Sequence, residues 1–110
     1  MNKNLLIEKY DSILDSLNMV FLVTSDEYME DRINEAMSDF EYMVKVLRGK
    51  EQQIDTSKTV EEYMESTLQS CIGNLEDALN HMNKEEWRYS KTVEEQLNIV
   101  IPLMKQVIKG

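Results

Sequence analysis

The chain has 110 residues, of which 42% are apolar, and it contains one proline, three glycines and one cysteine. This length and composition predict a single folded domain over residues 1–110, and a lone cysteine excludes an internal disulfide. The 21 acidic and 12 basic side chains give a net charge of −9. Such a charge repels phosphate backbones, which argues against direct binding of nucleic acid.

The sequence contains no segment with the features of a signal peptide or a membrane span. Its longest apolar run, residues 19–23, has five residues, whereas a spanning helix needs about 20. Charged residues interrupt the first eight positions, so no secretory apolar core is present there. We therefore expect a soluble, cytoplasmic protein, and a free thiol fits a reducing compartment.

Apolar residues recur at helical spacing through the first half of the chain. They predict helices over about 4–23 and 25–48. Thr24 stands three residues before a glutamate, which is the spacing of a helix-capping box, and Gly49 is a typical stop signal. Residues 19–23 are apolar on all sides, so this helix end is either buried in the core or part of a contact surface.

A hexapeptide, Ser-Lys-Thr-Val-Glu-Glu, occurs twice, at residues 57–62 and 90–95. Each copy carries Thr-x-x-Glu just before an apolar periodic run, which is again the capping-box spacing. The first copy predicts a helix over about 59–82. The second copy offers one start for a last helix, at Thr92, and Asn83 offers another start nine residues earlier.

The earlier start is favoured, because a last helix over about 84–108 keeps its apolar residues on one continuous face. The second hexapeptide then lies inside this helix, and the duplication is not a structural repeat. Pro102 predicts a kink near Asn98, since proline lacks the amide hydrogen that a helix interior uses. Four amphipathic helices of similar length predict an all-α protein, with an up-and-down four-helix bundle as its architecture.

One carboxylate pattern suggests metal-dependent chemistry. Glu61, Glu62 and Glu65 form a Glu-Glu-x-x-Glu motif that resembles the magnesium site of all-helical nucleotide pyrophosphohydrolases. The second element of such a site could only be Glu95-x-x-Asn98. On a helical wheel Glu62 points away from the apolar face, whereas metal ligands must converge on one point. A magnesium-dependent hydrolase is therefore only the third hypothesis for function.

Nucleophilic catalysis is not indicated by the remaining reactive side chains. Cys71 falls in the middle of an apolar helix face, where burial raises the thiol pKa and makes it unreactive. His81, the single histidine, falls at the edge of the same face. We expect no enzymatic activity, no cofactor and no metal ion.

Surface aromatic residues near acidic ones predict a site for a protein partner. Tyr28, Tyr42 and Val46 fall opposite the apolar stripe of the helix over 25–48, close to acids such as Asp39, and Trp87 falls off the stripe of the last helix. This combination suits a partner that offers apolar and basic groups. The alternative is ordinary surface tyrosine, or burial against a second subunit in a homodimer.

Methionine is abundant on the predicted apolar faces, where Met-rich surface can repack around varied helical ligands. The residues concerned are Met29, Met37, Met43, Met64, Met82 and Met104. We expect a protein-binding adaptor or export-chaperone-like module that docks a helical partner segment in an apolar groove, while its acidic faces select basic partners. The alternative is an acidic inhibitor, of phage or mobile-element type, that occupies a basic nucleic-acid-binding site.

The C-terminal third, over residues 75–109, resembles a family of small uncharacterised helical proteins from Gram-positive bacteria. In that family an Asp or Asn caps a last helix with an acidic-leucine stretch and a proline followed by leucine. The matching residues here are Leu79, Asn83, Trp87, Glu94, Glu95, Leu97, Pro102 and Leu103. The resemblance implies an all-helical fold and brings no catalytic residues, and the tryptophan it leads us to expect near Gln106 is missing.

Overall fold

The computed structural model describes residues 1–54, 56–82 and 88–110. These residues form four helices and no strand, namely α1 (Lys3–Val23), α2 (Glu27–Leu47), α3 (Val60–Met82) and α4 (Ser90–Lys109). The prediction of an all-α protein with four helices is confirmed. The first three helices begin and end within two residues of their predicted bounds, whereas the fourth begins later.

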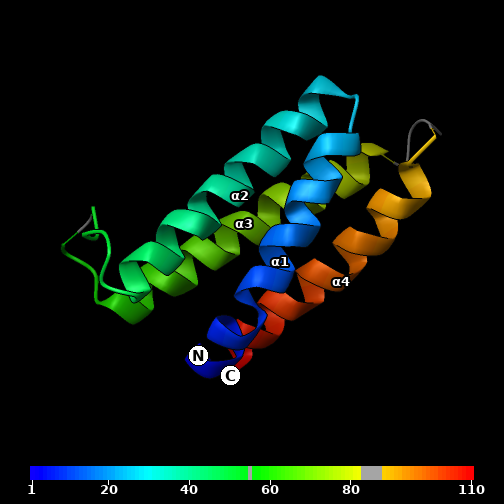
Figure 1. Ribbon diagram of the computed structural model, residues 1–110. Coiled ribbons are helices and arrows are strands. Elements are labelled where there is room, and N and C mark those ends of the chain that lie inside the picture. The colour runs from blue at the N-terminus through cyan, green and yellow to red at the C-terminus, as the bar shows by residue number, and fades with distance from the viewer. Residues whose placement is uncertain (55, 83–87) are drawn as a thin grey trace.

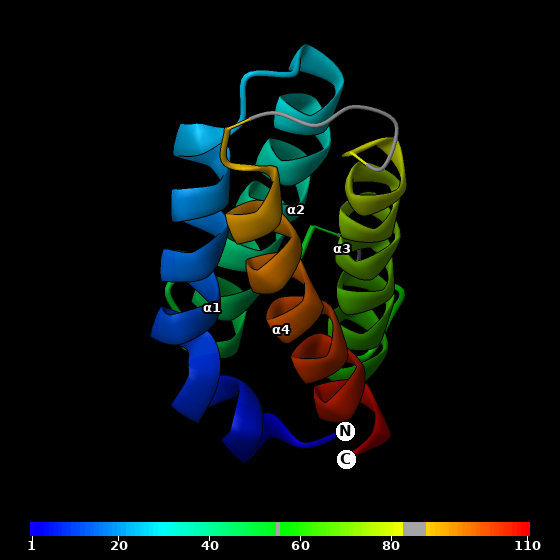
Figure 2. The same ribbon diagram turned by 90° about the vertical axis from the view of Figure 1, so that its right-hand side faces the viewer.

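The helices pack side by side as a bundle of 42 × 23 × 20 Å (Figure 1). Each helix contacts its two neighbours in the ring α1–α2–α3–α4, and α4 closes the ring against α1. Both termini lie at one end of the bundle (Figure 2), where the amide of Asn2 donates to the carbonyl oxygen of Val107 at 2.8 Å. The ring order places the seam between α2 and α3 opposite the seam between α1 and α4.

The predicted capping box at Thr24 is wrong, because Thr24 ends α1 and does not begin α2. Its hydroxyl and its amide both donate to the carbonyl oxygen of Val20, at 2.6 and 3.1 Å. The N-cap of α2 is Asp26, whose Oδ1 accepts the amide of Met29 at 3.0 Å. A carboxylate at this position satisfies a free amide and interacts favourably with the helix dipole.

The two copies of the hexapeptide have different structures. In the first copy the amide of Thr59 donates to Glu62 Oε1 at 3.0 Å, and the amide of Glu62 donates to Thr59 Oγ1 at 3.2 Å. This capping box is confirmed, and the hydrogen bond from Thr59 holds the pKa of Glu62 below its ordinary value. In the second copy α4 already begins at Ser90, so Thr92 is the third residue of the helix and not its cap.

The predicted start of the last helix at residue 84 is also wrong. Arg88 and Tyr89 form a turn, and α4 begins at Ser90 with Tyr89 as an N-cap that makes no side-chain capping bond. The side chain of Tyr89 is 40% exposed, so the apolar face that favoured an earlier start does not continue there. Asn83, the other proposed cap, lies outside the described residues.

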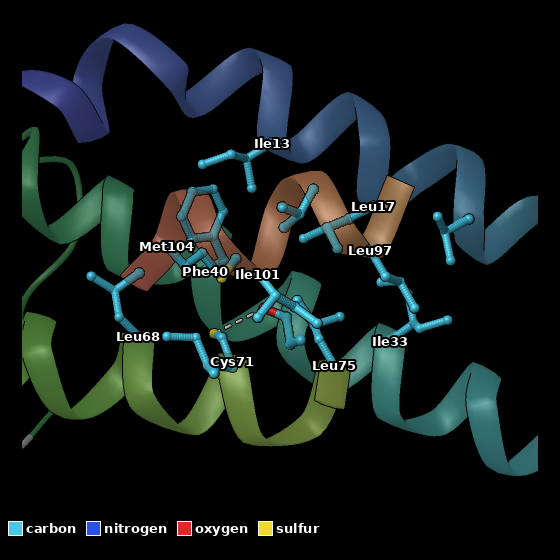
Figure 3. Packing of buried hydrophobic residues seen from close by; sticks show 14 of the residues in the cluster. Ile13, Leu17, Ile33, Phe40, Leu68, Cys71, Leu75, Leu97, Ile101 and Met104 are labelled. Atoms are coloured by element: carbon cyan, nitrogen blue, oxygen red, sulfur yellow. Dashed lines mark hydrogen bonds between the residues drawn. The ribbon is translucent and has the colours of Figure 1, made fainter. Parts of the chain in front are cut away.

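All four helices contribute to one hydrophobic core. Figure 3 shows Ile13 of α1, Phe40 of α2, Leu68 and Cys71 of α3, and Met104 of α4 packed close together. Each of these side chains is at most 1% exposed. Burial of such side chains is the main favourable contribution to the folding free energy.

The apolar segment at the end of α1 belongs only partly to this core. Val20 is 1% exposed, whereas Leu22 is 77% exposed and Met19 is 37% exposed. Phe21 and Val23 are partly buried against the core. One side of the segment is therefore buried in the core, while Leu22 on the other side is exposed to solvent.

Gly73 lies in the middle of α3 with an exposed position and ordinary helical backbone. A Cβ atom added there would meet no atom within 4 Å. We expect Gly73→Ala to raise the free energy of unfolding by about 0.5–1 kcal/mol, because alanine has less backbone entropy to lose on folding. Urea unfolding measures this change. A loss of stability would contradict it, and Gly49→Ala, at a φ of +75°, is the control that should destabilise.

Candidate functional site

The five predicted partner-binding residues do not form one site. Tyr28 lies in the first turn of α2, and Tyr42 lies 14 residues later, roughly 21 Å along the helix axis. Asp39 and Tyr42 lie together on the wall of a groove. Val46 is partly buried and does not line that groove, and Trp87 lies outside the described residues.

The groove runs along the seam between α2 and α3 and has a volume of about 520 Å³. Its lining combines one carboxylate, two tyrosines, three smaller hydroxyl side chains and one isoleucine. These residues are Asp39, Tyr42, Ile54, Tyr63, Ser66, Thr67 and Ser70. The α3 members recur at helical spacing, which places them on one face beside the core stripe.

Asp39 is the single ionisable carboxylate in this lining. Its side chain is partly buried, and burial, reinforced by the negative charge of Glu35, raises the pKa of Asp39 above its ordinary value. Within the described part of the chain, no cationic side chain lies in ion-pair distance of this carboxylate. The groove therefore holds a negative charge that is incompletely hydrated and that forms no ion pair within the described residues.

One tyrosine lines each wall of the groove, Tyr42 on α2 beside Asp39 and Tyr63 on α3. The hydroxyl of Tyr42 donates to the carbonyl oxygen of Gln52 at 2.6 Å and so attaches the connection after α2 to the helix. Burial raises the pKa of Tyr63, which remains a neutral hydroxyl at physiological pH. Ile54, in the connection, is 83% exposed and presents apolar surface at the groove edge. Lys58 stands at the rim, with Nζ 3.5 Å from Ser66 Oγ.

Tyr28 belongs instead to a cluster that joins α2 to the end of α3. Its ring contacts the ring of His81 at a tilt of 39°, with the centroids 4.6 Å apart, and the guanidinium of Arg32 lies 5.1 Å from the Tyr28 centroid. Nε2 of His81 lies 3.1 Å from Asp26 Oδ2, and Arg32 donates to the buried Asn74 at 3.2 Å. These intramolecular contacts give the side chain of Tyr28 a structural role, because they hold the start of α2 against α3.

Asp26 is the residue of this cluster with the clearest pH dependence. The hydrogen bond from Met29, together with His81, lowers the pKa of Asp26. Its stabilising effect is thus present above pH about 4 and is lost as pH falls through the lowered pKa. We expect Asp26→Ala to reduce the free energy of unfolding at pH 7 by about 1 kcal/mol. Urea unfolding at pH 7 and in acid should show a smaller deficit in acid.

Asp26→Asn is the matched control for that prediction, because asparagine keeps the capping oxygen and removes the charge. It should retain most of the stability that alanine loses at pH 7. An Asp26→Ala protein as stable as the parent at pH 7 would contradict the assignment of Asp26 as the functioning cap.

The structure places the candidate metal and nucleophile residues apart from the groove lining. Glu61 pairs with Lys3 at 3.3 Å, and Glu62 is engaged by Thr59. Among the described residues, no three His, Cys, Asp or Glu side chains are placed to hold one metal ion. Cys71 is buried, donates to the carbonyl oxygen of Ala36 at 3.3 Å, and has its pKa raised by burial to about 12.

The predicted Met-rich docking surface is not the surface of this groove. Five of the six methionines named from the sequence are buried in the core, and Met37 packs against it. The residues that the sequence did not single out are Ile54, Tyr63, Ser66, Thr67 and Ser70. The four of them that belong to α3 recur at helical spacing, which was a usable signal, but this spacing does not identify the neighbouring helix that they face.

No family model, no curated protein and no solved structure matches this chain. Within residues 1–54, 56–82 and 88–110, none of the helices combines the length and the apolar character needed to cross a membrane. The groove between α2 and α3 is the candidate binding site, because it contains two of the predicted partner-binding residues.

Proposed function

We propose that this chain is a non-enzymatic protein-binding module, an adaptor or export-type chaperone, which docks a basic helical segment of a partner in the groove between α2 and α3. The observation that supports this most directly is Asp39, a partly buried carboxylate without a cation in the described structure. Protein folding alone gives no reason to keep such a charge, because its desolvation lowers stability. A positive group from a partner would remove that penalty.

The chemistry of the groove indicates which partner groups fit. A Lys or Arg side chain would bring its charge to Asp39 and lie between the rings of Tyr42 and Tyr63, whose faces attract cations. The hydroxyls of Ser66 and Ser70 can accept further hydrogen bonds from the same group. Apolar residues of the partner helix, one turn away from its Lys or Arg, would cover Ile54.

A peptide-display selection tests this proposal, because a random library takes the place of a named partner. The parent protein is the bait, and the Asp39→Lys variant is the matched bait with an altered groove. We expect the parent to enrich peptides with basic residues beside apolar ones at helical spacing, and the variant to lose that enrichment. Enrichment of neutral or acidic peptides, or equal enrichment by both baits, would refute the proposal.

The alternative function, an acidic inhibitor of a basic nucleic-acid-binding site, is supported by the exposed acids of α1 and α2. These are Glu8, Asp11, Asp15, Glu27, Asp31 and Glu35. Binding through such exposed charges is strongly screened by salt, whereas docking in a partly apolar groove is screened less. Affinity that collapses between about 0.1 and 0.5 M salt would favour the inhibitor.

The proposal assumes an up-and-down bundle in the cytoplasm with a bend in α4. The ring order of helix contacts and the short connection between α1 and α2 support the topology. Pro102 lies inside α4 and leaves the carbonyl of Asn98 without its usual helical donor, which supports a bend there. Residual dipolar couplings along α4 measure that bend directly.

A further inference from the structure

A second groove follows the seam between α1 and α4, on the opposite side of the bundle from the α2–α3 groove. Its volume is about 710 Å³. The lining consists of Lys9, Ser12, Ile99, Pro102, Leu103, Lys105, Gln106 and Lys109. Every ionisable side chain in this lining is a lysine, although the whole chain has a net charge of −9.

All three lysine side chains reach solvent, and two of them pair with acids that lie outside the lining. Lys9 lies 3.8 Å from its neighbour Glu8, and Lys105 lies 3.7 Å from Glu76, with both lysine side chains more than 40% exposed. Exposed ion pairs of this kind contribute little to stability and exchange readily. Lys109 makes no ion pair with any residue in the described part of the structure.

The floor of the groove is apolar. Ile99 is 57% exposed, Pro102 is exposed and Leu103 is partly buried. Pro102 also lacks the amide that would donate to the carbonyl of Asn98, so this carbonyl, beside the floor, is without its usual helical donor. Between Ile99 and Lys109 the groove follows roughly 15 Å of α4, which matches about three turns of a partner helix.

We propose that the α1–α4 groove docks an acidic amphipathic helix of a second protein partner. Charge complementarity selects the partner, because this is the lysine-lined groove of a strongly acidic molecule. The apolar floor selects an amphipathic protein segment over nucleic acid, whose phosphates gain nothing from Ile99 and are repelled by the rest of the surface. The site is independent of the α2–α3 groove, so one module could join a basic and an acidic partner.

A defined probe tests the site. It is a fluorescein-labelled synthetic helix of about 18 residues, with leucines on one face and glutamates on both flanks. We expect saturable binding by fluorescence anisotropy at about 0.15 M salt. The double variant Lys105→Gln, Lys109→Gln should weaken binding at least about tenfold. Ile99→Ser should weaken it as well, because it removes the apolar contact.

Lys91→Gln is the matched control, because Lys91 is an exposed lysine of α4 outside the groove. It should leave the affinity unchanged, and circular dichroism confirms that each variant is folded. The proposal is overturned if the groove variants bind the probe as the parent does, or if a probe with lysines in place of glutamates binds equally well. Tighter binding to vesicles rich in phosphatidylserine, or to a single-stranded oligonucleotide, would also overturn it in favour of that ligand.

Discussion

Phe40→Ala is expected to lower the free energy of unfolding by about 3–5 kcal/mol, a large part of the 5–15 kcal/mol typical of a domain. Phe40 is fully buried where all four helices meet (Figure 3). Its ring lies 5.8 Å from the ring of Tyr10. Truncation removes apolar burial from each neighbour and leaves a cavity that the helices cannot fill completely. Urea unfolding followed by circular dichroism measures the loss.

Phe21→Ala is the matched control, since it deletes the same atoms from the second phenylalanine of the chain. Phe21 is only partly buried, at the end of α1. Its truncation should cost distinctly less than that of Phe40. Equal losses, or a Phe40→Ala protein within about 1 kcal/mol of the parent, would contradict the packing described for the centre of the bundle.

Asp39→Asn is expected to change stability and partner binding in opposite directions. Because the folded protein raises the pKa of Asp39, it binds the proton more tightly than the unfolded chain does. The contribution of Asp39 to stability is therefore most favourable below the unfolded pKa of about 4, and it becomes less favourable as pH rises through the folded pKa. Asparagine removes the charge with little change of shape, so the variant should be at least as stable as the parent at pH 7.

The same variant should bind basic helical peptides about 10- to 100-fold more weakly, since the partner's cation loses its counter-charge. Titration calorimetry with a peptide selected by the parent measures this effect. Asp15→Asn, an equal charge change at an exposed position of α1, should leave both quantities nearly unchanged. A less stable Asp39→Asn protein with undiminished binding would mean that Asp39 serves the fold and not a partner.

Helical periodicity was sufficient to predict the class of the fold and three of the four helices. Helix ends were harder, because several residues compete to cap them. At the start of α2, Thr24 and Asp26 both have the chemistry of an N-cap, and the choice depends on Thr24 bonding back to Val20 at the end of α1. For α4, neither Asn83 nor Thr92 immediately precedes the first helical residue, Ser90.

The candidate site was less predictable than the fold, because it lies between two helices. The sequence places Asp39 and Tyr42 on one helix face, and the structure confirms that they lie together. It cannot show that Tyr63 and Ser66 stand opposite them, since that depends on how α2 and α3 pack. Tyr28 looks equivalent to Tyr42 on a helical wheel, yet its ring contacts His81, a residue 53 positions later in the chain.

Nuclear magnetic resonance mapping of the docked peptide shows whether a basic helix binds between α2 and α3. The protein is labelled with nitrogen-15 and titrated with the basic helical peptide that the parent selects. We expect the largest amide shifts on the groove lining, around Asp39, Tyr42, Tyr63, Thr67 and Ser70. Shifts confined to α1 and α4, with the α2–α3 groove unchanged, would contradict it.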